Sequence, residues 1–341
     1  MERHPAASPG CRRCTVTTNT TPAYANPVIP QRADPWVWRH SDGYYYFTGS
    51  VPTYDRIELR RARTIQGLGD AEPVTVWTRY PSGPLSANIW APELHHIDGA
   101  WYIYFAAART TETDNGLFDH RMYALECRDA NPLTGQWVEK GQVDSGWESF
   151  CLDATSFEHR GTRYYVWAQK DPAIEGNSNL YIAPMANPWT LAGPAVMLSQ
   201  PEYEWETIGF RVNEGAAVIV RHDRVFIAYS GSATDHHYCM GLLYADADAD
   251  LLDPSAWTKK PQPVFESSSE NGQYGPGHNS FTVSEDGQHD VLIYHARNYR
   301  DIDGDPLYDP NRHTRAQLIE WDADGFPVFG QPVPDWPVQS G

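Results

Sequence analysis

The sequence is poor in cysteine. It has 5 cysteines, an odd number, and Cys127, Cys151 and Cys239 lie far apart in apolar surroundings. A disulfide framework is therefore not expected. Cys11 and Cys14 form a Cys-x-x-Cys pair, but no second pair follows it, so we expect neither a zinc site nor a redox site there.

Positive charge and long apolar runs are also scarce. Lysine and arginine total 26 against 44 acidic residues, which gives a formal net charge of −18. This negative charge repels nucleic acid and anionic membrane surfaces, so we do not expect them as partners, whereas a neutral ligand is compatible with the charge. No stretch approaches the roughly 18 consecutive apolar residues of a membrane helix.

The first 22 residues contain no apolar run. We therefore expect residues 1–22 to be an unstructured leader and not a signal peptide. This favours a cytoplasmic protein, or a secreted one if the start of the chain is misassigned.

What the sequence does contain is a pattern about 60 residues long that occurs five times. Each copy has a polar residue near an apolar stretch, then a turn, then a strand rich in aromatic and β-branched residues. Three of the turns are Asp-Gly, a hairpin signal. The leading polar residues are Asp34, Glu93, Asp153, Glu214 and Asn279.

Two hairpins, hence four strands, fit into each copy. Four-stranded units at a fixed period are typical of propeller blades. The sequence therefore predicts an all-β fold, a five-bladed β-propeller, formed as a single domain by residues 23–341, with Arg315 to Trp336 supplying the outer strands of the last blade. A β-sandwich whose strands resemble one another by coincidence is the alternative.

In a propeller, equivalent residues of each innermost strand form a ring around the axis. Asp34, Glu93, Asp153 and Glu214 would then converge on one small space, where like charges raise each other's pKa. Such clusters are more often functional than structural. Two carboxylates across a pocket suit glycoside hydrolysis, and a third would keep the acid protonated. A ring of carboxylates that binds a cation is the alternative.

At these residues the chain resembles glycoside hydrolase family 43, from about Asn26 to Pro334. Five motifs carry the resemblance: Ala33-Asp34-Pro35, Trp90-Ala91-Pro92-Glu93-Leu94, Leu152-Asp153-Ala154, Asn213-Glu214-Gly215 and Gly277-His278-Asn279-Ser280. The resemblance implies an inverting mechanism. In it Asp34 is the general base, Glu214 is the general acid, and Asp153 raises the pKa of Glu214 and orients it. Glu93 has no part in that chemistry and is expected to support the pocket.

The resemblance also implies substrate and ion contacts. His278 would help to hold a cation on the axis through a shell of water, with calcium the usual candidate; a buried histidine that donates to a carboxylate is the alternative. Arg297 would hold a sugar hydroxyl, or else partner the surplus carboxylates. Trp90 would form a wall of the pocket. No cofactor is required.

Within the family, the chain is most similar to exo-acting α-L-arabinofuranosidases. The stretches Asn177–Ala183, Tyr274–Asn279 and Asp309–Arg315 carry this likeness. It implies release of arabinose from α-1,5-linked arabinan or arabino-oligosaccharides, and short imported oligosaccharides if the protein is cytoplasmic. The alternatives are a β-xylosidase, an enzyme that removes arabinose branches from xylan, a retaining enzyme that acts on fructosides, and a sugar-binding propeller without catalysis.

Overall fold

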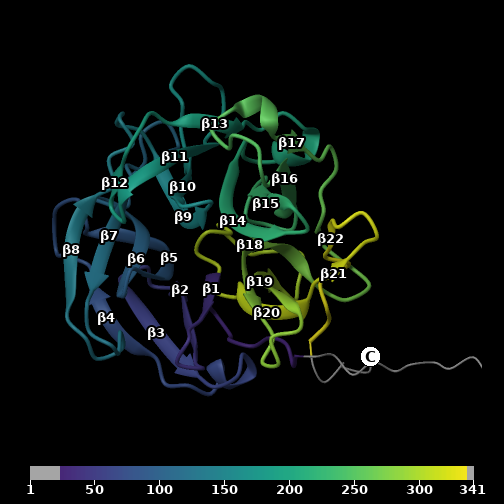
Figure 1. Cartoon of the computed structure of the whole chain (residues 1–341), viewed down its shortest axis with the longest axis horizontal. Coiled ribbons are helices and arrows are strands. Elements are labelled where there is room, and N and C mark those ends of the chain that lie inside the picture. The colour runs from purple at the N-terminus through teal and green to yellow at the C-terminus, as the bar shows by residue number, and fades with distance from the viewer. Residues whose placement is uncertain (1–23, 336–341) are drawn as a thin grey trace, which may run out of the picture.

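The computed structural model describes residues 24–335, so the predicted leader lies outside the described residues. Five antiparallel sheets surround a central axis, with β1, β5, β9, β14 and β18 innermost (Figure 1). Each of these strands contacts the innermost strands of the two neighbouring blades, so the ring is closed. The predicted five-bladed β-propeller is confirmed.

Within each blade the strands follow one another outward from the axis. The first blade consists of β1 (Ala33–Arg39), β2 (Tyr45–Ser50), β3 (Arg56–Ala62) and β4 (Val74–Thr78). The second consists of β5 (Ala87–Ile97), β6 (Ala100–Ala108), β7 (Arg121–Cys127) and β8 (Trp137–Gln142). The third consists of β9 (Cys151–His159), β10 (Thr162–Gln169) and β11 (Asn179–Asn187), with β12 (Thr190–Leu191) and β13 (Val196–Ser199) both paired to β11.

The last two blades complete the circle. The fourth consists of β14 (Asn213–Arg221), β15 (Arg224–Gly231), β16 (Cys239–Asp246) and β17 (Thr258–Lys259). The fifth consists of β18 (Tyr274–Val283), β19 (Asp290–Arg297) and β20 (His313–Leu318), and β21 (Glu320–Trp321) pairs with β22 (Pro327–Val328) in a separate sheet. Three short 3-10 helices are η1 (Gln66–Leu68), η2 (Glu204–Glu206) and η3 (Pro254–Ala256). No helix in the described residues is long and apolar enough to cross a membrane.

The fifth blade differs from the prediction at its outer edge. Its third strand, β20, falls in the expected place, but β21 and β22 pair with each other and not with β20. The N-terminal segment takes the free edge of β20 instead, because Ile29 forms an antiparallel bridge with Thr314. The Asn26 side chain adds hydrogen bonds of 2.9 Å to both the N–H and the carbonyl of Ala316. The two ends of the chain thereby close the ring and cover an open strand edge.

Every innermost strand is interrupted by the same β-bulge. Two residues stand unpaired on the inner strand against one on its partner, which bends the strand and redirects its side chains. The first residue of each bulge has a positive φ, between 42° and 57°. These equivalent residues are Asp34, Ala91, Asp153, Gly215 and His278.

The bulges correct the predicted ring. Asp34 and Asp153 are equivalent, as expected, but Glu93 lies two residues after its bulge position, Glu214 one residue before and Asn279 one residue after. The repeat in the sequence shows where the strands are, but an inserted backbone residue leaves no hydrophobic signature. Glycine at position 215 leaves room for His278, because a Cβ there would lie 3.1 Å from the His278 ring, which is a tight contact.

Aromatic side chains fill the space between blades. Trp101, Trp167, Tyr104, Tyr165 and Tyr229 are almost fully buried. Neighbouring blades meet through such contacts, as between the Tyr104 and Tyr165 rings, whose centroids are 5.3 Å apart and nearly perpendicular. Burial of large rings is the main source of stability between sheets that share few backbone hydrogen bonds.

Candidate active site

A pocket of about 260 Å³ lies where the bulges converge. Its polar lining includes Asp34, Asp153, Glu214, His278 and Arg312. Apolar side chains surround them, chiefly Trp90, Phe118, Phe150, Leu152, Phe210, Val212 and Leu307. Five of the six predicted site residues therefore share one pocket, and Arg297 is the exception.

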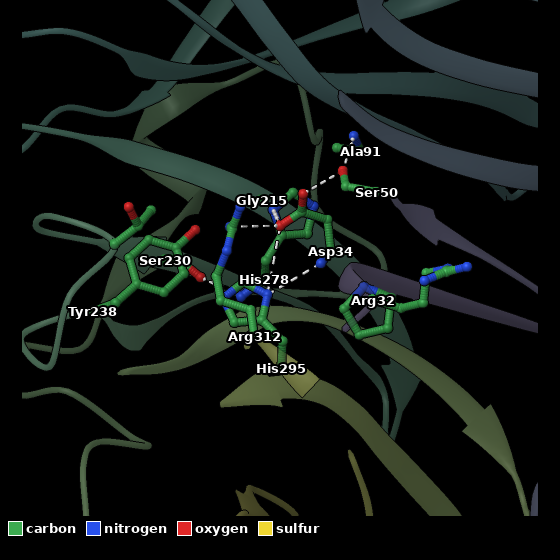
Figure 2. Close-up of polar contacts among 12 residues, drawn as sticks. Arg32, Asp34, Ser50, Ala91, Gly215, Ser230, Tyr238, His278, His295 and Arg312 are labelled. Atoms are coloured by element: carbon green, nitrogen blue, oxygen red, sulfur yellow. Dashed lines mark hydrogen bonds and ion pairs between the residues drawn. The ribbon is translucent and has the colours of Figure 1, made fainter. Parts of the chain in front are cut away.

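The bulges release backbone N–H groups from the strand ladder, and side chains accept them. Asp34 donates to Nδ1 of His295 at 3.1 Å, and Ala91 donates to Oγ of Ser50 at 2.8 Å (Figure 2). The N–H of Gly215 donates to Oδ2 of Asp153 at 3.2 Å. These hydrogen bonds tie the bulged backbone to the side chains of the site, so that each holds the other in position.

Asp34 is held as an ionised carboxylate. Ser50 donates to its Oδ2 at 2.5 Å, Arg312 donates to its Oδ1 at 3.3 Å, and Nδ1 of His278 lies 3.4 Å from the same Oδ1 (Figure 2). Burial would raise its pKa, but the charges of His278, Arg312 and His295 and the Ser50 hydrogen bond outweigh burial, so the pKa of Asp34 falls well below its usual range. Burial lowers the pKa of both imidazoles, so Arg312 is the permanent cation in this group.

Glu214 has the opposite electrostatic setting. It is partly buried in the pocket wall, and removal from water, with a contribution from the Asp34 charge, raises its pKa to about 7. The hydroxyl of Tyr238 donates to its Oε1 at 3.0 Å and, together with Arg312, limits this rise. Glu214 can therefore hold a proton near neutral pH and release it to a neighbouring oxygen.

The protonation of Asp153 depends on that of Glu214. Burial first, and then the negative charges of Glu214, Asp34 and Glu93, raise the pKa of Asp153 well above its usual value, against the N–H of Gly215. Two buried carboxyls that interact this strongly titrate as a pair. The two carboxyls therefore hold protons more readily than isolated carboxyls do.

Glu93 lies outside the pocket lining. It is buried, and its Oε2 is 2.9 Å from Nε2 of His95 on the same strand. Burial raises its pKa well above the usual value, although a hydrogen bond from Thr155 of the third blade opposes this. Glu93 thus bridges two innermost strands, which agrees with the supporting part expected for it.

Arg297 does not reach the pocket, and its prediction as a sugar contact is wrong. It is 1% exposed and donates to Asp309 at 3.0 Å, to the carbonyl of Thr234 at 2.6 Å and to that of Pro306 at 2.7 Å. Thr234 and Pro306 both line the pocket. Arg297 therefore ties two pocket walls together from behind, and the alternative of a carboxylate partner is the correct one.

The arginine that does face the pocket is Arg312, which the sequence analysis did not single out. Besides Asp34, it donates to the hydroxyl of Tyr54 at 2.7 Å, and Tyr54 donates to the carbonyl of Leu307 at 2.6 Å. Arg312 lies just before β20, outside the repeating strand pattern. It did fall inside the Asp309–Arg315 stretch that carried the subgroup likeness, which was the only signal available.

Several polar atoms near Asp34 and His278 lack a protein partner. Both polar atoms of the Asn279 side chain and Nε2 of His295 are buried without a protein partner. Such atoms require water or an ion. Within residues 24–335, the one close set of three metal-ligating side chains is Asp235, His236 and His237, and its two imidazoles do not suit calcium. An ion on the axis would thus have to be held by His278 and Asn279 through water.

Comparison with known proteins gives a family match. Residues 24–327 match the model of glycosyl hydrolases family 43. The chain is 56% identical over 321 residues to an extracellular exo-alpha-(1->5)-L-arabinofuranosidase of Streptomyces avermitilis, covering 94% of this chain and 66% of that protein. It is 56% identical over 326 residues to alpha-L-arabinofuranosidase 43 of Humicola insolens, covering 95% of this chain and 67% of that protein. The chain thus spans about two thirds of the length of these two relatives.

A solved structure matches over more of its length. The alpha-L-arabinofuranosidase from Lactobacillus brevis superimposes with a TM-score of 0.90 at 59% identity. The match covers 91% of this chain and 97% of that one. The likeness therefore extends over the whole propeller, including the strands that carry the pocket.

Removal of the Arg312 charge should change the ionisation of Asp34. We expect Arg312→Met to raise the pKa of Asp34, because the permanent cation beside it is lost. The acid limb of kcat/KM then moves to higher pH, and the rate falls by about 100-fold. Arg121→Met, which removes an ion pair with Glu148 outside the pocket lining, is the control and should leave the profile in place. An unshifted acid limb in Arg312→Met would contradict the assignment.

Proposed function

The chain belongs to glycosyl hydrolases family 43, and we propose that it is an exo-acting α-L-arabinofuranosidase that inverts configuration. Its substrates would be the ends of α-1,5-linked arabino-oligosaccharides or arabinan. The observation that carries the proposal is a pair of carboxyls with opposite electrostatic settings in one pocket, which lower the pKa of Asp34 and raise that of Glu214. Glycoside hydrolysis requires such a pair, with a carboxyl of low pKa as the base and one of raised pKa as the acid.

In the proposed reaction Asp34 accepts a proton from a water molecule, and the oxygen of that water attacks the anomeric carbon. Glu214 donates its proton to the glycosidic oxygen as the bond to the leaving sugar breaks. Asp153 holds negative charge or a shared proton beside Glu214, which keeps the acid protonated until it acts. Ser50 and Arg312 fix the orientation of Asp34.

The shape of the pocket supports action at chain ends. Leu307 lines it, and its carbonyl accepts the hydroxyl of Tyr54, while Arg297 holds the neighbouring Pro306. These contacts fix the segment between β19 and β20 against the pocket. We infer that this fixed segment blocks one side of the pocket, so that the pocket admits one terminal sugar, whereas an endo-acting enzyme needs an open cleft.

The compartment, and with it the chain length of the substrate, stays a prediction. The Streptomyces avermitilis relative is named as an extracellular enzyme. A secreted protein could meet polymeric arabinan, whereas a cytoplasmic one would meet only short imported oligosaccharides. Neither polymer nor oligosaccharide is excluded by a pocket that accepts chain ends.

Calcium on the axis is a subsidiary proposal. His278 and Asn279 would hold the ion through water, and the ion when bound would offset part of the negative charge of the nearby carboxylates. We expect a chelator to lower the unfolding temperature and added calcium to restore it. An unfolding temperature that is the same with chelator and with calcium would exclude the ion.

The catalytic assignment predicts large losses from single substitutions. Asp34→Ala and Glu214→Ala should each lower kcat on arabino-oligosaccharides by about 100- to 10,000-fold, since each removes one of the two proton-transfer groups. Circular dichroism should show an unchanged fold. Near-normal turnover in Asp34→Ala would refute the base, and no turnover by the unaltered protein would favour a sugar-binding propeller.

The pH profile reports on the shared proton. Because Glu214 must be protonated, activity of the unaltered protein should fall as the pH rises through about 7. Asp153→Asn should move this basic limb to lower pH, because the partner that shares the proton is gone. A basic limb that stays in place would show that Asp153 does not influence the acid.

Sugar preference separates the proposal from its nearest rival. We expect 4-nitrophenyl α-L-arabinofuranoside to be hydrolysed faster than 4-nitrophenyl β-D-xyloside, and linear arabino-oligosaccharides faster than arabinoxylan. The measurement is initial rate for the chromogenic pair and product analysis for the natural pair. The reverse order in both would make the protein a xylosidase or a debranching enzyme.

A further inference from the structure

Another buried carboxylate, Glu206, lies close to the acid in sequence but outside the pocket lining. It ends η2, just before β14, and is 0% exposed. Its two oxygens accept from Nζ of Lys259 at 2.7 and 2.9 Å and from the hydroxyl of Tyr229 at 2.8 Å. The N–H groups of Glu202 and Tyr203 donate to it at 2.8 and 2.9 Å. A buried charge with this many partners is fixed in position.

Glu206 reaches the acid through Asn213, the residue before Glu214. Nδ2 of Asn213 donates to Oε1 of Glu206 at 2.9 Å. Its Oδ1 accepts from Ser199 of the third blade at 2.6 Å, and its backbone N–H donates to the carbonyl of Ser178 at 3.1 Å. The start of β14 is therefore held between Glu206 on one side and the third blade on the other.

The bulge makes this restraint important for Glu214. Glu214 is the last paired residue before the bulge, and Gly215 follows it with a φ of 57°. The ladder is interrupted after Glu214, so its backbone is restrained mainly from the Asn213 side. A shift of Asn213 would therefore move the Glu214 carboxyl.

We propose that Glu206 is a positioning residue for proton transfer, which holds Asn213 so that the Glu214 carboxyl keeps its place against the leaving oxygen. The inference rests on the proposed function, since it takes Glu214 as the general acid. A displacement of even about 1 Å in a catalytic group can cost on the order of 100-fold in rate. Glu206 itself touches no reacting atom.

The second blade contains a matched group that serves as a control. Glu126 of β7 is 5% exposed and accepts from the hydroxyl of Tyr102 at 2.8 Å and from Nζ of Lys140 at 3.3 Å. This group also combines a glutamate, a tyrosine and a lysine of one blade, with Arg128 as a further partner of Glu126 at 2.9 Å. None of the three residues lines the pocket.

Leaving-group dependence distinguishes positioning of the acid from general damage. Arabinobiose has a poor leaving group that needs protonation, whereas 2,4-dinitrophenyl α-L-arabinofuranoside has one that leaves without it. We expect Glu206→Gln to lower kcat on arabinobiose by tenfold or more, within the roughly 100- to 10,000-fold that general acids contribute. On the dinitrophenyl substrate kcat should stay within about threefold. Glu126→Gln should leave both rates near those of the unaltered protein.

Two further variants keep the test decisive. Asn213→Ala breaks the link but leaves Glu206 paired with Lys259, and it should show the same selective loss even if Glu206→Gln folds poorly. Glu214→Gln should show the same pattern with a larger loss. Equal losses on both substrates, or no loss, in Glu206→Gln and Asn213→Ala would overturn the positioning role alone. No leaving-group dependence in Glu214→Gln would instead refute the general acid, and the proposed function with it.

Discussion

The five bulges at the axis are the constraint on which the rest of the structure depends. In each innermost strand the paired ladder breaks for two residues, and the first of them takes a positive φ. That conformation costs about 1–3 kcal/mol for a residue other than glycine, so it persists only where its surroundings fix it. Here the surroundings are the freed N–H groups, which donate to side chains such as Ser50, His295 and Asp153.

Asp34 and Glu214 differ in pKa because the bulged strands turn their side chains toward different neighbours. Asp34 is turned toward Arg312 and Ser50, and Glu214 toward a tyrosine hydroxyl and apolar walls. Asp34 is buried and Glu214 is partly buried, so removal from water alone would raise both pKa values. The charges of His278, Arg312 and His295, together with the Ser50 hydrogen bond, reverse the direction for Asp34 alone. The chemistry of the pocket therefore depends on the position of Arg312 as much as on the carboxylates.

Behind the pocket, buried polar groups hold backbone segments that strand pairing does not hold. Arg297 ties together two wall segments, and Glu206 restrains the start of β14 through Asn213. The Glu126 group shows that the same chemistry also occurs away from the pocket lining. Buried ion pairs of this kind specify one arrangement of the chain more than they add stability.

The sequence by itself determined the number of blades and the order of the strands, because the spacing of residues shows a repeat of strands and turns directly. The repeat predicted four carboxylates near the axis, and the family resemblance selected Asp34, Asp153 and Glu214 from them as the catalytic candidates. Only the tertiary structure decided which residues are equivalent around the axis, since a bulge inserts a residue without changing the hydrophobic pattern. It also decided which arginine faces the pocket. Arg297 and Arg312 are both buried and both paired with carboxylates, and what separates them is the path of the segment between β19 and β20. Contacts between residues nearly 280 positions apart, such as Arg312 with Asp34, are formed only when the ring closes.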